Sequence, residues 1–197
     1  MDLILASTSR YRRELLARLT AKFRCVAPEI DETPLLDEPP HALTTRLAWH
    51  KARAVAERNP GSMVIGSDQV ADHSGRILGK PHTAENACAQ LAACSGEHVV
   101  FHTAVCIVDA RSETDPQQMP RYCAQDSTRV HFRTLDTDEI ARYVEREQPL
   151  DCAGSFQCEG LGIALFERIE TNDPTALIGL PLIALCRLLR EAGVQTI

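Results

Sequence analysis

Segments with the periodicity of strands and of helices alternate along this chain, and this alternation is the feature that most restricts its fold. The predicted strands are 3–5, 23–27, 63–65, 77–78, 98–110, 127–133 and 162–169, and the predicted helices are 9–19, 40–58, 83–94, 136–145 and 180–191. Segments 77–78 and 127–133 are predicted to pair as hairpins with the strands before them, so the sheet cannot be purely parallel. We therefore predict one α/β domain with a mixed sheet, covering residues 1–197.

The composition is that of an ordinary globular protein, with 44% hydrophobic and 24% charged residues. A chain of 197 residues can bury about 70% of its unfolded surface, so its core needs no disulfide or metal. The 27 acidic residues outnumber the 21 Lys and Arg, giving a net charge of −6. Nucleic acids and membrane surfaces attract clustered basic charge, and no segment approaches the roughly 20 apolar residues of a membrane span. We predict that the chain binds neither of them.

Eight cysteines are scattered along the chain without a CxxC pair, mostly inside apolar periodic segments. A disulfide framework is not expected in a chain of this length whose first residues do not resemble an export signal. We therefore predict reduced cysteines and a cytoplasmic location.

The segment LASTSRYRRELL runs from a strand through a hydroxyl-rich turn into a helix. Unpaired backbone N–H groups and the positive end of the helix dipole can bind an anion beside Ser7, Arg10, Arg12 and Arg13. The alternative is a capped surface helix with solvated arginines. Because three arginines in the first turn oppose the helix dipole unless an anion compensates them, we favour the anion site.

Two further segments carry groups suited to phosphate chemistry. VIGSDQV delivers Asp68 at the end of an apolar strand, where a carboxylate suits a general base or a metal ligand. GKP places Lys80 on a loop where its ammonium can meet a phosphate, and the acidic loop around Glu32 can share Mg²⁺ with Asp68. Each signal alone is also compatible with a solvated polar residue.

Eight motifs together resemble the Maf family of nucleotide pyrophosphatases in their order and approximate spacing over essentially the whole chain. They are LASTSRYRRELL, PEIDE, RLAWHKA, IGSDQV, GKP, FRTL, CAGSFQCEGLG and GLPL. SDQV and GSFQCEG look most like the subgroup that acts on 7-methyl-GTP, because the dTTP/UTP enzymes carry ADT and AYxIQG there. The resemblance implies a fold akin to the inosine triphosphate pyrophosphatases with a cleft between two lobes, a divalent metal such as Mg²⁺ or Mn²⁺, and a homodimer.

The resemblance also implies roles for individual residues. Asp68 would be the general base, and Glu32 and Asp68 would hold the metal. The substrate-binding residues would be Ser7, Arg12, Arg13, Lys51 and Lys80. The residues that select the base would be Tyr11, Gln69 and Glu159.

The implied reaction is hydrolysis of 7-methyl-GTP to the nucleoside monophosphate and pyrophosphate. Methylation at N7 gives guanine a positive charge and makes its N1–H and 2-amino group better donors, which suits a carboxylate at Glu159. Tyr11 could stack on the cationic ring. Two alternatives stay open: a dTTP/UTP pyrophosphatase of the same family, and a non-catalytic regulator of septum formation.

Two positions depart from the family pattern. Most relatives have Pro where this chain has Arg10, and Glu where it has His50. Arg10 adds a cation beside the phosphate site, so we expect binding to be sensitive to salt. His50 removes a carboxylate, which puts in doubt any role that carboxylate has in holding metal or orienting the lysine.

Overall fold

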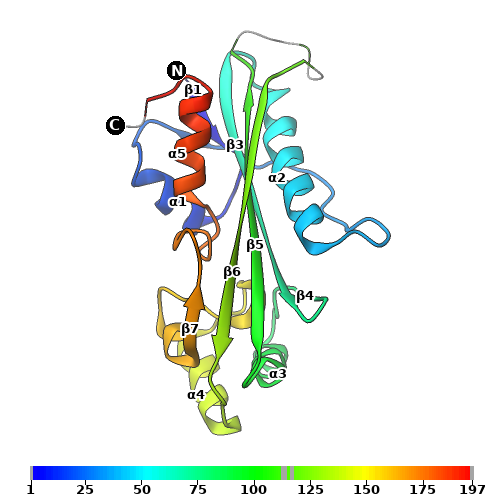
Figure 1. The fold of residues 1–197 in the computed structure, drawn as a ribbon, viewed down its shortest axis with the longest axis vertical. Coiled ribbons are helices and arrows are strands. Elements are labelled where there is room, and N and C mark those ends of the chain that lie inside the picture. Colours follow the sequence, from blue (N-terminus) through cyan, green and yellow to red (C-terminus); the bar gives the residue numbers. More distant parts are fainter. Residues whose placement is uncertain (1, 112–114, 116–117, 196–197) are drawn as a thin grey trace. The chain divides into compact units, whose positions relative to one another are not determined.

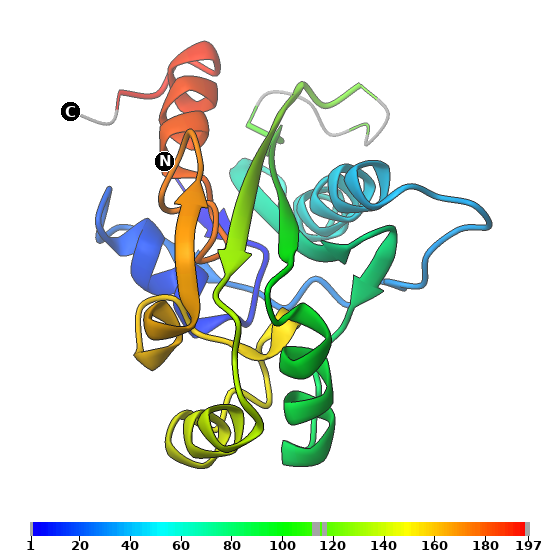
Figure 2. The same ribbon diagram turned by 60° about the horizontal axis from the view of Figure 1, so that its bottom comes forward.

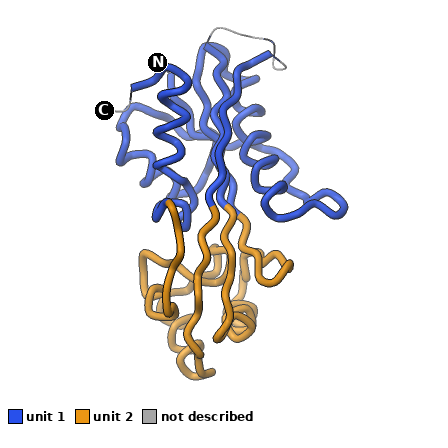
Figure 3. The backbone as a smooth tube through the Cα atoms, viewed as in Figure 1, with its two compact units in different colours: residues 1–69, 103–126, 173–197 blue, residues 70–102, 127–172 orange. Residues whose placement is uncertain are grey.

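The structure, a computed structural model, describes residues 2–111, 115 and 118–195. The chain forms two compact units, coloured separately in Figure 3. Unit 1 comprises Met1–Gln69, Thr103–Asp126 and Asp173–Ile197, and unit 2 comprises Val70–His102 and Ser127–Asn172. The chain therefore passes from one unit to the other several times.

The strands form a mixed sheet, as the sequence predicts. They are β1 (Asp2–Leu5), β2 (Arg24–Cys25), β3 (Ser62–His73), β4 (Arg76–Leu78), β5 (His98–Asp109), β6 (Arg121–Phe132) and β7 (Phe166–Glu170). The strand order is β2-β1-β3-β5-β6-β7, and β4 pairs with β3. β1 is parallel to β2 and β3, whereas the β3–β4 and β6–β7 pairs are antiparallel.

The α-helices are α1 (Arg10–Ala17), α2 (Pro40–Ala56), α3 (Ala84–Cys94), α4 (Thr137–Glu147) and α5 (Leu182–Glu191), and the 3₁₀ helices are η1 (Ala153–Ser155) and η2 (Leu161–Leu165). Ser9 caps α1 by accepting the Arg12 N–H, and Asp136 caps α4 by accepting the Glu139 N–H, as the sequence predicts. Across the described ranges, no helix is long and apolar enough to cross a membrane.

Helices cover both faces of the sheet in unit 1 (Figure 1). Side chains from β1, β3 and β5 pack against α1 and α5 on one face, with Ile65 and Leu185 fully buried. The other face of β1 and β3 packs against α2, where Val64 and Ala52 are fully buried. Because successive strand residues point to opposite faces, neighbouring residues of β3 face different helices.

The core of unit 2 contains a cluster of phenylalanine rings. Phe101, Phe132, Phe156 and Phe166 meet edge to face, with ring centroids 4.7–5.7 Å apart. This geometry is favourable for aromatic rings because the positive edge of one meets the negative face of another. α3 and α4 lie side by side in this unit (Figure 2).

Several predicted boundaries are wrong. β3 extends to His73 because its last three residues pair with β4, and β6 starts at Arg121 because its polar first half lies beside β5. The predicted strand over 162–169 begins only at Phe166, and η2 precedes it. Periodicity alone does not detect strands whose polar residues are paired elsewhere in the fold.

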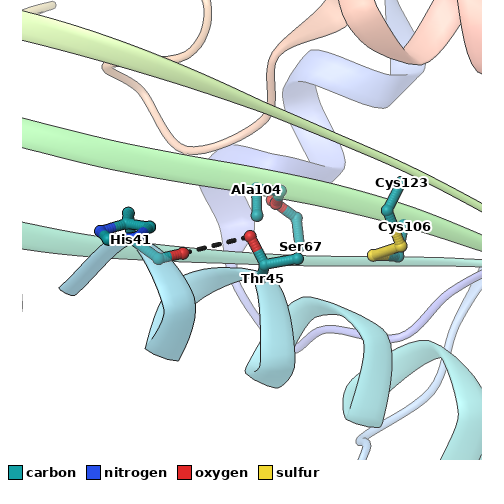
Figure 4. The surroundings of a disulfide bond; sticks show 6 residues. All are labelled: His41, Thr45, Ser67, Ala104, Cys106 and Cys123. Atoms are coloured by element: carbon teal, nitrogen blue, oxygen red, sulfur yellow. Dashed lines mark hydrogen bonds between the residues drawn. A yellow bond between two sulfur atoms is a disulfide. The ribbon is translucent and has the colours of Figure 1, made fainter. Parts of the chain in front are cut away.

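The prediction of eight reduced cysteines is also wrong, because Cys106 and Cys123 form a disulfide. They lie on the neighbouring strands β5 and β6, with their Cα atoms 4.1 Å apart (Figure 4). The sequence gives no sign of this pair, since 17 positions separate the two residues and only the strand pairing brings them together. The other six cysteines, all within the described part of the chain, are not joined in disulfides.

Candidate active site

A lysine and two acidic residues meet in unit 1. The Nζ of Lys51, on α2, lies 2.7 Å from Oδ1 of Asp68 and 3.0 Å from Oε1 of Glu32. Asp68 lies on β3, and Glu32 lies on the loop before α2. The side chains of Lys51 and Asp68 are 7% and 8% exposed, whereas that of Glu32 is 56% exposed. Three predicted site residues from separate segments are therefore in contact.

Gly66 explains why α2 can lie so close to β3. A Cβ atom at Gly66 would lie 2.2 Å from the carbonyl oxygen of Ala48 and 2.6 Å from the backbone nitrogen of Ala52. Both atoms belong to the backbone of α2, so any larger residue would push the helix away from the strand. This close approach sets Lys51 against Asp68.

Asp68 has the electrostatic environment of a general base. Burial raises its pKa above the ordinary value, and the negative charge of Glu32 acts in the same direction. The positive charges of Lys51 and Arg12 lower the pKa but do not offset the burial. A carboxylate with a raised pKa accepts a proton more readily than an exposed aspartate does.

The turn between β1 and α1 has the form that an anion site requires. Ser7 is only 5% exposed, and its Oγ accepts the backbone N–H of Ser9 at 3.1 Å. Ser9 in turn caps the helix. The first turn of α1 contains no acidic side chain, so no carboxylate of that turn would repel an anion at the helix N-terminus.

A backbone carbonyl holds Arg12 in place. The Nε of Arg12 donates to the Gly179 carbonyl at 2.9 Å, and the hydroxyl of Ser67 donates to the same oxygen at 2.9 Å. Gly179 has a φ of +123°, a conformation that L side chains rarely adopt. Burial lowers the pKa of Arg12, and the charges of Asp68 and Glu32 oppose that shift. The guanidinium is therefore anchored close to the two carboxylates.

Gln69 is tied to the rest of unit 1 by its amide group. Its Nε2 lies within hydrogen-bond distance of Oγ1 of Thr103 at 3.0 Å and of the carbonyls of Ala176 and Leu177 at 2.9 and 3.0 Å. The amide group is thereby oriented. Whether Gln69 selects the base stays a prediction.

The other predicted residues of the first helix are more exposed. Arg13 is exposed on α1, and Tyr11 is half-buried. The guanidinium of Arg10 stacks over the Tyr11 ring, 4.6 Å from its centroid, and donates to its hydroxyl at 2.7 Å. Arg10, which departs from the family pattern, therefore contacts Tyr11, the side chain expected to stack on the base.

Two predicted residues belong to unit 2. Lys80 is exposed after β4. Glu159 is exposed in the loop between η1 and η2, where its Oε2 accepts from the Cys158 thiol at 3.1 Å.

Sequence reasoning missed the residues that hold the acidic loop. Arg46 donates to both carboxylate oxygens of Glu38, at 2.6 and 2.7 Å, and to the Thr33 carbonyl at 3.1 Å. These hydrogen bonds lower the pKa of Glu38 to about 2. The segment next to Glu32 is therefore fixed to α2. The sequence did offer a signal for this role in Arg46, the first residue of RLAWHKA, because an arginine within that motif can anchor the neighbouring loop.

Asp173 is a second residue that sequence reasoning missed. It is 2% exposed, its Oδ1 accepts from the N–H and hydroxyl of Thr175, and its Oδ2 accepts the N–H of Ile183 in the first turn of α5. These bonds fix the loop that contains Gly179. An aspartate before Pro in TNDPTALIGLPL is a turn signal, which could have identified it.

Glu32 and Asp68 have the chemistry of ligands for a divalent cation. Both carboxylates reach the same cationic atom, the Nζ of Lys51. Mg²⁺ is usually held by one or two carboxylates together with substrate phosphates, so this donor pair fits it. Among the described residues, no group of three or more His, Cys, Asp or Glu side chains is placed to hold a metal ion.

This chain matches a known protein family and several known proteins over nearly its whole length. A family described as Maf-like protein matches residues 2–192. A 7-methyl-GTP pyrophosphatase of Xanthomonas oryzae pv. oryzae (strain MAFF 311018) is 58% identical over 191 residues, covering 97% of this chain and 96% of its own. One of Aromatoleum aromaticum, with the same name, is 53% identical over 192 residues, covering 98% of this chain and 96% of its own.

A solved structure supports the fold. A HAM1 protein from Coxiella burnetii matches 98% of each chain with a TM-score of 0.51 at 14% sequence identity. At that identity the match concerns the fold alone. The predicted mixed α/β fold is confirmed.

Proposed function

This chain belongs to the family of Maf-like proteins, and from that premise we propose that it is a nucleotide pyrophosphatase that hydrolyses 7-methyl-GTP. Relatives that are 53–58% identical over nearly the whole chain carry the name of that activity. The observation that carries the proposal is the buried carboxylate of Asp68, in contact with Lys51 and within the electrostatic reach of Arg12.

Asp68 acts as the general base in this proposal. It takes a proton from water, whose oxygen forms a bond to the α-phosphorus while the bond from that phosphorus to the bridging oxygen of the β-phosphate breaks. The products are the nucleoside monophosphate and pyrophosphate. The raised pKa of Asp68 supports the role, because the carboxylate must accept the proton near neutral pH.

A few positively charged residues balance the charge of the triphosphate, although the protein as a whole has a net charge of −6. Arg12 is anchored through its Nε, which leaves the terminal nitrogens of its guanidinium to face phosphate oxygens. Ser7 uses an oxygen lone pair for the Ser9 N–H, so its hydroxyl proton can be donated to a phosphate. We assign Arg13, Lys51 and Lys80 to the same charge-balancing role.

Glu32 and Asp68 would hold a divalent cation, Mg²⁺ or Mn²⁺. When bound, such a cation neutralises charge that develops on the departing pyrophosphate. The ammonium of Lys51 contacts both carboxylates, so it holds them close together before substrate and cation arrive, and the net negative charge that remains favours a cation.

Glu159 would select the methylated base. A carboxylate accepts from the N1–H and the 2-amino group, and these donors are stronger when the guanine ring is positively charged. Gln69 and Tyr11 would complete the selection, with the Tyr11 ring stacking on the base. A homodimer is part of the same proposal and rests on the family resemblance. A cytoplasmic location is also part of it, although the disulfide between Cys106 and Cys123 removes the cysteine argument for that location.

Hydrolysis of a nucleotide panel tests the proposal. We expect the purified protein, with Mg²⁺ or Mn²⁺, to hydrolyse 7-methyl-GTP in preference to GTP, dTTP and UTP. Asp68→Asn should abolish hydrolysis while nucleotide binding stays detectable by calorimetry. Faster hydrolysis of dTTP or UTP would overturn the choice of substrate, and equal rates for wild type and Asp68→Asn would remove Asp68 from the role of base. No hydrolysis of any nucleotide would favour a non-catalytic role.

A further inference from the structure

Helix α4 holds the loop of residues 157–162 at two points in unit 2. Near the start of the loop, the backbone N–H of Gln157 donates to the hydroxyl of Tyr143 at 3.1 Å. Near its end, the backbone N–H of Leu161 donates to Oε2 of Glu147 at 2.8 Å. Tyr143 is 6% exposed, so the first anchor is part of the core. The second anchor is the half-buried side chain of Glu147.

The loop packs directly onto the Glu147 carboxylate. A Cβ atom at Gly160 would lie 2.3 Å from Oε1 and 2.9 Å from Cδ of Glu147, so only glycine fits while the carboxylate stays in place. The Gln157 carbonyl accepts the N–H groups of Gly160 and Gly162, at 3.2 and 3.1 Å, which closes the loop on itself. The loop is therefore a tight turn whose C-terminal half rests on one acidic side chain.

Glu159 lies between the two anchors. It is exposed, and the Cys158 thiol donates to its Oε2 at 3.1 Å. Gln157 and Leu161, two residues before and two residues after Glu159, each donate a backbone N–H to a side chain of α4. A side chain that must meet two donors of a base needs its backbone fixed to within a fraction of an ångström.

We infer that Glu147 is a positioning residue for substrate selection: its carboxylate fixes the 157–162 loop and thereby the direction in which Glu159 meets the base. This inference rests on the proposed function, in which Glu159 selects 7-methylguanine. Glu147 itself touches no substrate in this scheme. Its effect must therefore pass through Glu159, and this requirement separates positioning from a general loss of stability.

Four variants distinguish positioning of the loop from a general loss of stability. Glu147→Ala removes the anchor, whereas Glu147→Gln keeps an oxygen that can accept the Leu161 N–H. Gly160→Ala forces the Glu147 carboxylate to move without removing it. Glu145→Ala, on the exposed side of the same helix, is the matched control. For each variant, kcat/KM is measured with 7-methyl-GTP and with GTP, and thermal unfolding is followed by circular dichroism.

We expect the ratio of the two kcat/KM values to fall about fivefold in Glu147→Ala and in Gly160→Ala, the effect of one lost hydrogen bond. In Glu147→Gln and Glu145→Ala the ratio should stay within about twofold of wild type. In a Glu159→Gln background, Glu147→Ala should change the ratio no further. If Glu147→Ala does not fold, Gly160→Ala provides the same measurement.

Two results would overturn the inference: an unchanged ratio in the folded Glu147→Ala or Gly160→Ala protein, or a fall of the same size in the Glu159→Gln background. Either result leaves the proposed function intact if Glu159→Gln alone lowers the ratio. If Glu159→Gln leaves the ratio unchanged, base selection by Glu159 fails, and the inference about Glu147 fails with it.

Discussion

The Nζ of Lys51 lies 2.7 Å from Oδ1 of Asp68, with only 7% and 8% of the two side chains exposed. Removing one partner of such a buried pair leaves the other charge unpaired, whereas an exposed pair would contribute little. The pair also tunes the general base, because Lys51 opposes the rise in the pKa of Asp68 that burial causes. Both effects can be measured.

Replacing Lys51 with Met should move the acid limb of the pH profile of kcat/KM to higher pH. Burial raises the pKa of Asp68 and the Lys51 charge lowers it, so without Lys51 the pKa rises further. Asp68 must be ionised to accept a proton, so activity would be lost at a higher pH than in wild type. We therefore expect the acid limb of Lys51→Met to lie measurably above that of wild type. Lys51→Arg keeps the charge and should leave the limb near its wild-type position. An acid limb that is the same in Lys51→Met and wild type would show that Asp68 is not the titrating group.

Replacing Gly66 with Ala should lower both stability and activity. The new methyl group would lie 2.2 Å from the Ala48 carbonyl oxygen, and α2 would have to move. Overpacking of this kind costs about 1–3 kcal/mol of unfolding free energy, measured by chemical denaturation. Because α2 carries Lys51, kcat/KM should fall as well. Gly79→Ala is the matched control for stability, since a Cβ there would meet no atom within 4 Å. Equal stability of the two variants would contradict this account of the close approach.

Local signals predicted part of this fold well. The buried strand at Leu3, the cap at Ser9 and the cap at Asp136 each depend on residues within a few positions, and the structure confirms all three. The contact of α2 with β3 could not be predicted in this way, because the short distance at Gly66 exists only after two distant segments have packed.

The candidate site likewise contains residues that the sequence identified and contacts that only the fold creates. Family resemblance identified Asp68 and Lys51, and the structure brings them together. The carbonyl of Gly179 that anchors Arg12 has no sequence signal, because any residue offers a carbonyl and only the fold decides where it points. The disulfide between Cys106 and Cys123 is similar, since the pairing of β5 with β6 creates it.

Replacing Arg10 with Ala should make substrate binding less sensitive to salt. Arg10 is exposed at the start of α1, where it adds positive charge beside the proposed triphosphate site. Exposed charges are screened over a Debye length of about 8 Å at physiological salt. We therefore expect KM to rise less steeply with salt in Arg10→Ala than in wild type. Arg18→Ala provides the control, because α1 has 8 residues and Arg18 lies about 12 Å along the helix, beyond that length. Parallel salt dependences for Arg10→Ala and wild type would argue against an electrostatic role for Arg10.

Reduction should raise the number of thiols from six to eight and change the fluorescence of Trp49. Cys123 is exposed and Cys106 is fully buried, so a reductant would attack the disulfide at the sulfur of Cys123. Trp49, the single tryptophan, packs against the cluster that contains Cys106. A nearby disulfide quenches tryptophan emission, so reduction should increase it. The measurements are thiol titration of the unfolded chain and emission of the native protein, each before and after reduction. In Cys123→Ser, eight minus one leaves seven cysteines, and we expect seven thiols under both conditions with no change in emission. Eight thiols in the unreduced, air-exposed protein would contradict the pairing of Cys106 with Cys123.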